Sequence, residues 1–265
     1  MKVITVTNHK GGVGKTTVSC NLASGISRIK KSNGDTYNVL ILDLDPQGNA
    51  SQTMLRKGES ATNTLTEALA GVPIMECIYP TIQKGLFIIP SNLVLFQEEI
   101  KMLSSPSCAL FIKDLFASNK SSLDQFDYII IDSPPNLGPF MMNSIAVCDY
   151  YIVPLEMGSL YSLLGINNLE ERVIDVQRGT GTKGKLLGYL LNKYDGRTSA
   201  GQQMKSQVRH FYRDRVLDTV IRKNTTIERA QSSNKSIFSF DLSSYGAKDF
   251  SSLANEVIMK IGANR

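Results

Sequence analysis

The stretch NHKGGVGKTT at residues 8–17 decides the fold of this 265-residue chain. It follows the short apolar run KVITVT at residues 2–7 and leads into a helix-like segment at residues 15–29. Its glycines are Gly11, Gly12 and Gly14. Glycines let the backbone bend so that successive N–H groups face one anion, and the start of the following helix adds partial positive charge. A strand, a glycine-rich loop and a helix in this order predict a phosphate-binding loop.

Individual side chains of this loop have the chemistry of nucleotide binding. We expect Lys15 to reach the β- and γ-phosphates and the Thr16 hydroxyl to ligate Mg²⁺. Further phosphate contacts are expected from Val13 and Thr17. The strict GxxxxGK[ST] spacing fails at its first position, which is His9, and a second lysine, Lys10, precedes the glycines. The alternative, a glycine-rich turn without function, does not account for the agreement of strand, loop and helix.

Strand-like and helix-like segments alternate along the rest of the chain. The expected strands are residues 2–7, 39–43, 86–90, 127–132, 150–155 and 185–192. The expected helices are residues 15–29, 64–70, 93–103, 109–118, 138–147, 160–177, 201–212 and 247–261. The strand-like runs are apolar rather than alternating, as in parallel strands covered on both faces. We therefore predict one α/β domain over residues 1–265, with a doubly wound, mainly parallel sheet and helices on both faces.

The composition excludes several other classes of protein. The chain is 42% hydrophobic and 20% charged, which excludes disordered, collagen-like and disulfide-scaffold proteins. No apolar run reaches the roughly 20 residues of a membrane span, and the first residues lack the architecture of a signal peptide. The cysteines are Cys20, Cys77, Cys108 and Cys148, with no pair at CxxC spacing. We expect reduced structural thiols in a cytoplasmic protein.

Two more expected strands are followed or ended by aspartate residues. VLILDLDPQGNASQ at residues 39–52 places Asp43 and Asp45 on the same side of an extended chain. FDYIIIDSPPNLG at residues 126–138 places Asp132 at a strand end, where it would hold Mg²⁺. A carboxylate at the lip of a phosphate site can also orient a water. Capping of the turn before the following proline is the alternative for Asp43 and Asp45.

These motifs resemble those of a known family. KGGVGKTT is similar to the deviant phosphate loop of the ParA/MinD group of P-loop ATPases, and DLDPQGNAS resembles the ParA/Soj partition proteins. The resemblance implies an ATPase that uses ATP and Mg²⁺, with Lys15 and Lys10 as catalytic lysines. It implies that Lys10 reaches across a dimer interface to the nucleotide of the partner subunit. It further implies that Asp45 positions the attacking water, and that Asp43 is a metal-shell or supporting carboxylate.

The C-terminal third is basic. Residues 180–235 contain twelve Lys and Arg against four acidic residues, a net charge of +8 in a chain of net charge +5. A basic region on a mildly acidic body suggests a polyanionic partner. The resemblance implies DNA binding without sequence preference through Arg197, Arg222 and Lys223. A solvated basic face is the alternative.

The same region departs from the family pattern. Family members commonly show TVIPRN followed by EAP, whereas this chain has Arg222 and Lys223 for the Pro-Arg pair and Arg229-Ala230-Gln231 for the triplet. Asn192 ends a strand, and either contact with the adenine or a turn-capping role is compatible with that position. The adenine and partner contacts of this region therefore stay open.

The resemblance predicts a complete ATP cycle. We expect a Mg²⁺-dependent ATPase that forms a homodimer with ATP, binds non-specific double-stranded DNA and drives plasmid or chromosome partition. A ParB-like, centromere-binding partner would stimulate hydrolysis. We expect a cytoplasmic protein that is nucleoid-associated in its ATP state, with no stable membrane anchor and no helix-turn-helix segment before the first strand.

Three other functions remain to be weighed. A MinD-like membrane-cycling ATPase needs a C-terminal amphipathic anchor, but we expect the apolar stripe at residues 253–261 to be the packed face of the last helix. An iron–sulfur carrier needs paired cysteines, which the scattered positions argue against. A nucleotide-gated adaptor for another cargo would share the ATP site without binding DNA.

Overall fold

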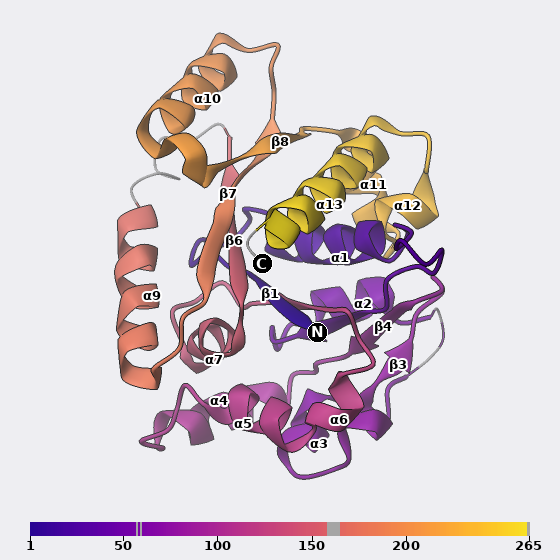
Figure 1. The fold of residues 1–265 in the computed structure, drawn as a ribbon, viewed down its shortest axis with the longest axis vertical. Helices are drawn as coiled ribbons and strands as arrows, with labels where there is room; N and C mark the ends of the chain where they lie inside the picture. The colour runs from indigo at the N-terminus through magenta and orange to yellow at the C-terminus, as the bar shows by residue number, and fades with distance from the viewer. Residues whose placement is uncertain (57, 59, 158–164, 264–265) are drawn as a thin grey trace.

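One sheet forms the centre of the protein (Figure 1), whose computed structural model describes residues 1–56, 58, 60–157 and 165–263. Its strands are β1 (Lys2–Val6), β2 (Val39–Asp43), β3 (Tyr79–Pro80), β4 (Leu86–Ile89), β5 (Tyr128–Asp132), β6 (Tyr150–Glu156), β7 (Lys185–Tyr194) and β8 (Val216–Arg222). The order across the sheet is β3-β4-β2-β5-β1-β6-β7-β8. The described pairs are parallel except for β3 with β4 at one edge. The predicted doubly wound, mainly parallel α/β fold is confirmed.

Helices cover both faces of this sheet (Figure 1). They are α1 (Lys15–Ile26), α2 (Asn49–Met54), α3 (Leu65–Leu69), α4 (Leu95–Leu103), α5 (Phe111–Ser118), α6 (Lys120–Leu123), α7 (Pro139–Val147), α9 (Ile166–Thr180), α10 (Ser199–Tyr212), α11 (Thr225–Ser232), α12 (Ile237–Phe240) and α13 (Tyr245–Ala263). Apolar side chains of α1, α12 and α13 form one buried cluster with the sheet. Those of α4, α5, α7, α9 and α10 form the other. The sheet therefore has a separate apolar core on each face.

The register of the central strands brings three strand ends together. In the pairing of β5 with its two neighbours, Asp132 lies opposite Val6 of β1 and opposite Asp43 of β2. Every residue of β2 and β5 is buried, as their apolar sequences predict for strands covered on both faces. The loops that follow β1, β2 and β5 consequently leave the sheet side by side at its carboxyl edge, where such folds bind ligands.

Several elements differ from the prediction: strands β3 and β8 and helices α2, α6, α11 and α12 were not predicted, and other elements differ in their bounds. Strand β8 was not predicted, because its pattern VLDTVIR interrupts the apolar residues with polar ones, as suits the edge of a sheet. Helix α2 was not predicted either, because it has only six residues and follows a turn at Gly48 with φ 64°. The helix predicted for residues 160–177 runs over Ile166–Thr180, and residues 160–164 lie outside the described part of the chain.

The last helix is part of the core. Leu253, Val257 and Ile261 of α13 are buried, and α13 packs on α1 and β8. The apolar stripe at the C-terminal end is thus a packed face, as predicted. Among the helices of the described residues, none combines the length and the apolar character that a bilayer crossing requires.

Candidate functional site

The phosphate loop connects β1 to α1 and is anchored by its first residues. The Asn8 side chain donates to the carbonyl of Pro154 at 2.8 Å and accepts from the Lys10 amide at 3.0 Å. Gly12 and Gly14 have φ angles of 77° and 90°, values that residues other than glycine rarely adopt. Val13 between them is fully buried. The first residues of the loop are therefore held by hydrogen bonds, and the path of its backbone requires glycine at two positions.

Lys15 lies inside the loop at the start of α1. Only 7% of the residue is exposed, and its Nζ donates to the Lys10 carbonyl at 3.0 Å. Burial lowers the pKa of Lys15, and the charges of Asp132 and Asp45 oppose that shift. The loop thus holds a largely buried ammonium group close to the carboxyl groups of Asp132 and Asp45.

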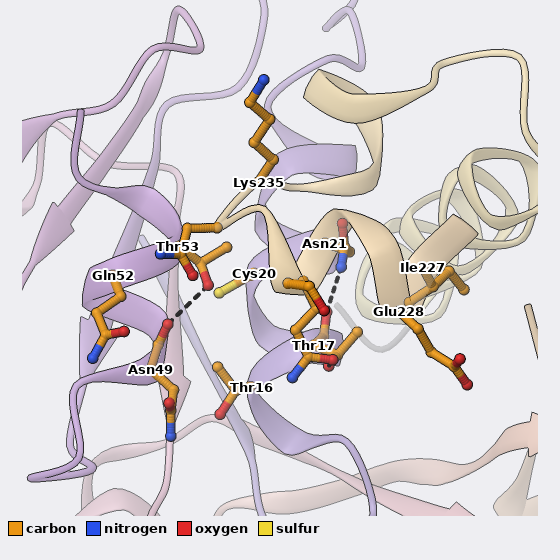
Figure 2. Close-up of a pocket in the computed structure, with 13 residues that line it drawn as sticks. Thr16, Thr17, Cys20, Asn21, Asn49, Gln52, Thr53, Ile227, Glu228 and Lys235 are labelled. Atoms are coloured by element: carbon orange, nitrogen blue, oxygen red, sulfur yellow. Dashed lines mark hydrogen bonds between the residues drawn. The ribbon is translucent and has the colours of Figure 1, made fainter. Parts of the chain in front are cut away.

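A cavity of about 370 Å³ opens beside the first turn of α1. Figure 2 shows Thr16 and Thr17 of α1, Asn49, Gln52 and Thr53 of α2, and Ile227 and Glu228 of α11 around it. The Thr17 hydroxyl donates to Gln231 Oε1 at 3.3 Å, which links α1 to the altered triplet of α11. Most of the lining residues are polar, and Thr16 is among them. The Thr16 side chain also acts on Asp132, because its hydrogen bond opposes the rise in the pKa of that carboxyl.

Asp132 is a fully buried carboxylate with one oxygen unsatisfied. Its Oδ1 accepts from the Ser19 hydroxyl at 2.9 Å, whereas its Oδ2 has no hydrogen-bond partner among the described residues. Burial raises the pKa of Asp132 to about 8, and the neighbouring charge of Asp43 adds to the rise. A buried oxygen without a donor is the kind of atom that a divalent cation satisfies.

Asp43 holds the loop that follows β2. Its Oδ1 accepts from the Asp45 amide at 3.1 Å, and its Oδ2 accepts from the Ser51 amide at 2.8 Å and the Ser51 hydroxyl at 2.7 Å. Burial raises the pKa of Asp43 to about 6, against the opposing effect of the Ser51 hydrogen bonds. For Asp43, these contacts favour the role of a supporting carboxylate over that of a metal ligand.

Asp45 lies two residues after Asp43, in the loop that follows β2. The residue is 8% exposed, and its Oδ1 accepts from the Gln47 amide at 3.0 Å. Its carbonyl accepts from the Ser91 hydroxyl at 2.5 Å, so the turn is also tied to the loop after β4. The backbone of Asp45 is therefore fixed from two sides near the phosphate loop.

The end of β7 contacts the loop through two consecutive side chains. Asn192 Nδ2 donates to the Val13 carbonyl at 2.7 Å, and Lys193 Nζ donates to the Gly12 carbonyl at 2.7 Å. Asn192 was a predicted site residue, and in this structure it braces the loop backbone. Lys193 was missed, because its sequence signal is only its position next to Asn192 at a strand end.

His9 occupies the position where the strict motif has glycine. Its ring packs against Gly165, where a Cβ would lie 2.3 Å from His9 Cε1. Burial lowers the pKa of His9, and the charges of Lys15 and Lys10 lower it further. The loop is thereby in contact with the start of α9, a neighbour that sequence spacing could not reveal.

The three predicted DNA-binding residues separate into two environments. Arg197 is highly exposed and forms a two-pronged ion pair with Asp195, with distances of 2.9 and 2.8 Å. Lys223 is exposed nearby, and its charge helps Arg197 lower the pKa of Asp195. Arg222 instead points to α13, with Nη2 2.5 Å from Asp249 Oδ1. Its guanidinium also lies over the Tyr245 ring, 4.7 Å from the centroid.

The cysteines form no shared site. All four are free, with Cys108 partly buried and the other three buried. Burial raises the pKa of Cys77 to about 11 and that of Cys148 to about 12, which leaves neutral thiols at ordinary pH. Within the described residues, no group of three or more His, Cys, Asp and Glu has the arrangement of a metal site.

Comparisons with known proteins agree with this site. A family model described as an AAA domain matches residues 1–186. The sporulation initiation inhibitor protein Soj of Bacillus subtilis (strain 168) is 34% identical over 257 residues, which are 97% of this chain and 98% of that protein. The chromosome partitioning protein ParA of Myxococcus xanthus (strain DK1622) is 30% identical over 260 residues, which are 98% and 88% of the two chains.

A solved structure extends the likeness to the three-dimensional fold. The cobyrinic acid a,c-diamide synthase of Mycobacterium smegmatis, with bound ATP analog and magnesium, superposes with a TM-score of 0.81 at 27% identity. The match covers 100% of this chain and 97% of that chain. The phosphate loop with its extra lysine, the carboxylates at the two adjoining strand ends and the full-length relatives converge on one assignment. The chain belongs to the ParA/Soj family of chromosome-partitioning P-loop ATPases.

Proposed function

We propose that this protein binds ATP with Mg²⁺, dimerises around the nucleotide, binds DNA without sequence preference and releases it after hydrolysis. In this role it separates copies of a plasmid or chromosome, and a ParB-like partner stimulates its ATPase activity. The observation that carries the proposal is the position of Asp132. Its unsatisfied buried Oδ2 lies at the strand end next to the phosphate loop, together with Lys15 and Asp45.

The residues divide the chemistry among themselves. The amides of residues 11–17 and the Lys15 ammonium hold the phosphates and stabilise negative charge that develops in the transition state. Thr16 and Asp132 would hold Mg²⁺, while Asp43 keeps the neighbouring turn in place. When bound, Mg²⁺ would neutralise negative charge on the phosphates. Asp45 accepts a hydrogen bond from the attacking water and directs it at the γ-phosphate.

Dimerisation supplies the extra lysine. Lys10 is partly buried in the phosphate loop, and its amide donates to Asn8 Oδ1 at 3.0 Å. We propose that its side chain reaches the nucleotide of the partner subunit, so that ATP is needed to hold the two subunits together. A cation that arrives only in the dimer makes hydrolysis depend on assembly.

DNA binding is assigned to the end of the sheet where β7 and β8 finish. Arg197 and Lys223 are exposed there, within a region of net charge +8. Contacts of this kind are with phosphates and read no sequence. Arg197 and Arg222 are both ion-paired, but the Arg222 side chain is 46% exposed against 86% for Arg197, and its partner Asp249 is nearly buried. We therefore assign Arg222 a smaller share of the DNA contacts than Arg197 and Lys223. Because both helical layers pack on one sheet, we propose that residues 1–265 work as a single domain.

The experiment is a DNA-binding titration with a duplex of arbitrary sequence. Binding is measured without nucleotide, with ADP and with ATP plus Mg²⁺, each over a series of salt concentrations. We expect tight, salt-sensitive binding only with ATP. Absence of DNA binding in every nucleotide state, with ATP-dependent dimerisation intact, would refute the DNA assignment. The cargo would then be a membrane or a protein. Co-sedimentation with vesicles in the presence of ATP would test the membrane.

A further inference from the structure

The end of β7 holds the phosphate loop through a residue that the motifs do not include. Asn192 and Lys193 are consecutive, and they donate to the consecutive carbonyls of Val13 and Gly12, each at 2.7 Å. The Lys193 ammonium also lies 3.1 Å from Glu156 Oε1 at the end of β6. Three strand ends, β1, β6 and β7, are therefore joined at the loop by one side chain.

The backbone of Lys193 supports a specific role. Its φ is 54°, in the left-handed region that residues with a Cβ adopt only at an energetic cost. Glycine would adopt the same conformation without that cost. A strained residue that is not glycine indicates that its side chain contributes something the conformation alone does not. In this structure that contribution is the contact with Gly12.

The hydrogen bond from Lys193 to Gly12 affects the direction in which the N–H groups of the phosphate loop point. A carbonyl oxygen held by a donor on the outer side of the loop leaves the adjoining N–H groups free to turn inward. The lysine also places a positive charge beside the loop without occupying the space for the phosphates. The ion pair with Glu156 alone would contribute little, because water screens the attraction between two partly exposed charges.

We propose that Lys193 is a positioning residue that holds the phosphate loop in its anion-binding conformation before ATP arrives. The inference rests on the proposed ATP-binding function and extends it to a residue outside the phosphate-loop motif. It predicts that Lys193 affects ATP affinity and leaves the chemical step largely alone, because its ammonium contacts a loop carbonyl and is not placed at the γ-phosphate.

The first test compares Lys193→Met with Lys185→Met, which removes the same charge at the opposite end of β7. A fluorescent ATP analogue is titrated into each protein with Mg²⁺, and hydrolysis is followed at saturating ATP. We expect the Kd of Lys193→Met to rise about three- to tenfold, the range for one partly exposed charged hydrogen bond, with kcat within twofold of wild type. Lys185→Met should match wild type, and Lys193→Arg should recover most of the affinity.

The second test separates the side chain from the backbone. Lys193→Gly relieves the strained conformation and removes the donor, so its thermal midpoint should equal or exceed that of wild type while its Kd rises as in Lys193→Met. A purely structural role would instead change stability and affinity together. Wild-type affinity in both the Met and Gly variants would overturn the inference and leave the proposed function intact. If wild type itself does not bind the analogue, the proposed function fails, and the inference with it.

Discussion

Substitution of Asp132 by asparagine isolates the effect of its buried charge. Asparagine keeps the shape and can still accept from the Ser19 hydroxyl, but it carries no ionisable group. In the wild type, burial raises the pKa of Asp132 from 3.8 to about 8. Between these two values the folded protein keeps a proton that the unfolded chain has lost. The unfolded state therefore binds fewer protons, and the free energy of unfolding falls as the pH rises.

The size of this effect follows from one proton. A difference of one bound proton changes the free energy of unfolding by about 1.4 kcal/mol per pH unit. Asp43, with a pKa of about 6, adds a slope of its own at lower pH, so the comparison is cleanest above pH 6. Between pH 6 and pH 8 the wild type should lose about 2 kcal/mol relative to Asp132→Asn.

The assay is urea unfolding at pH 6, 7 and 8, without nucleotide or divalent cations. Asp114→Asn, on the exposed side of α5, is the matched control and should follow the wild-type slope. Added Mg²⁺ should stabilise the wild type more at pH 8 than at pH 6, because the cation competes with the proton, and should leave Asp132→Asn unchanged. Parallel stability curves for wild type and Asp132→Asn over this pH range would refute the reasoning.

Three further predictions follow from the other contacts of the site. Asp45→Ala should retain ATP-dependent dimerisation, measured by light scattering, while hydrolysis falls by about 100-fold or more, and hydrolysis near the wild-type rate would remove Asp45 from the catalytic step. Lys223→Ala should reduce the salt dependence of DNA binding by about one unit, whereas Arg222→Ala should mainly lower stability by about 1 kcal/mol; equal salt slopes in wild type and Lys223→Ala would count against the assignment. Gly165→Ala places a Cβ 2.3 Å from His9 Cε1, so thermal unfolding should show a loss of about 1–3 kcal/mol. A neutral result there would mean that the His9 ring moves away freely.

The sequence was most informative where local chemistry constrains the chain strongly. A capping box begins α3, with the Thr64 amide 2.6 Å from Glu67 Oε2, and it depends only on two residues three positions apart in the sequence. Strand β8 could not be predicted from the sequence, because this edge strand has no strong apolar run and depends on its neighbour β7 for hydrogen bonds. Helix α2 was missed because six residues carry too little periodicity to stand out.

The candidate site shows the same division. The roles proposed for Lys15, Asp45 and Asp132 rest on short motifs, because a phosphate loop and strand-end carboxylates impose residue types at fixed spacings. The pairing of the exposed Arg222 depends on Asp249, which is 27 residues away in the sequence.

By itself, the sequence determined the fold class, the phosphate loop and the family, since each depends on contacts among residues close together in the chain. Only the tertiary structure decided which carboxylate oxygen stays unsatisfied and which cations are already paired. It also decided that Lys193 reaches a loop carbonyl 181 residues away. Contacts of this kind join strand ends that are distant in sequence, and they exist only once the parallel sheet has brought those ends to a single edge.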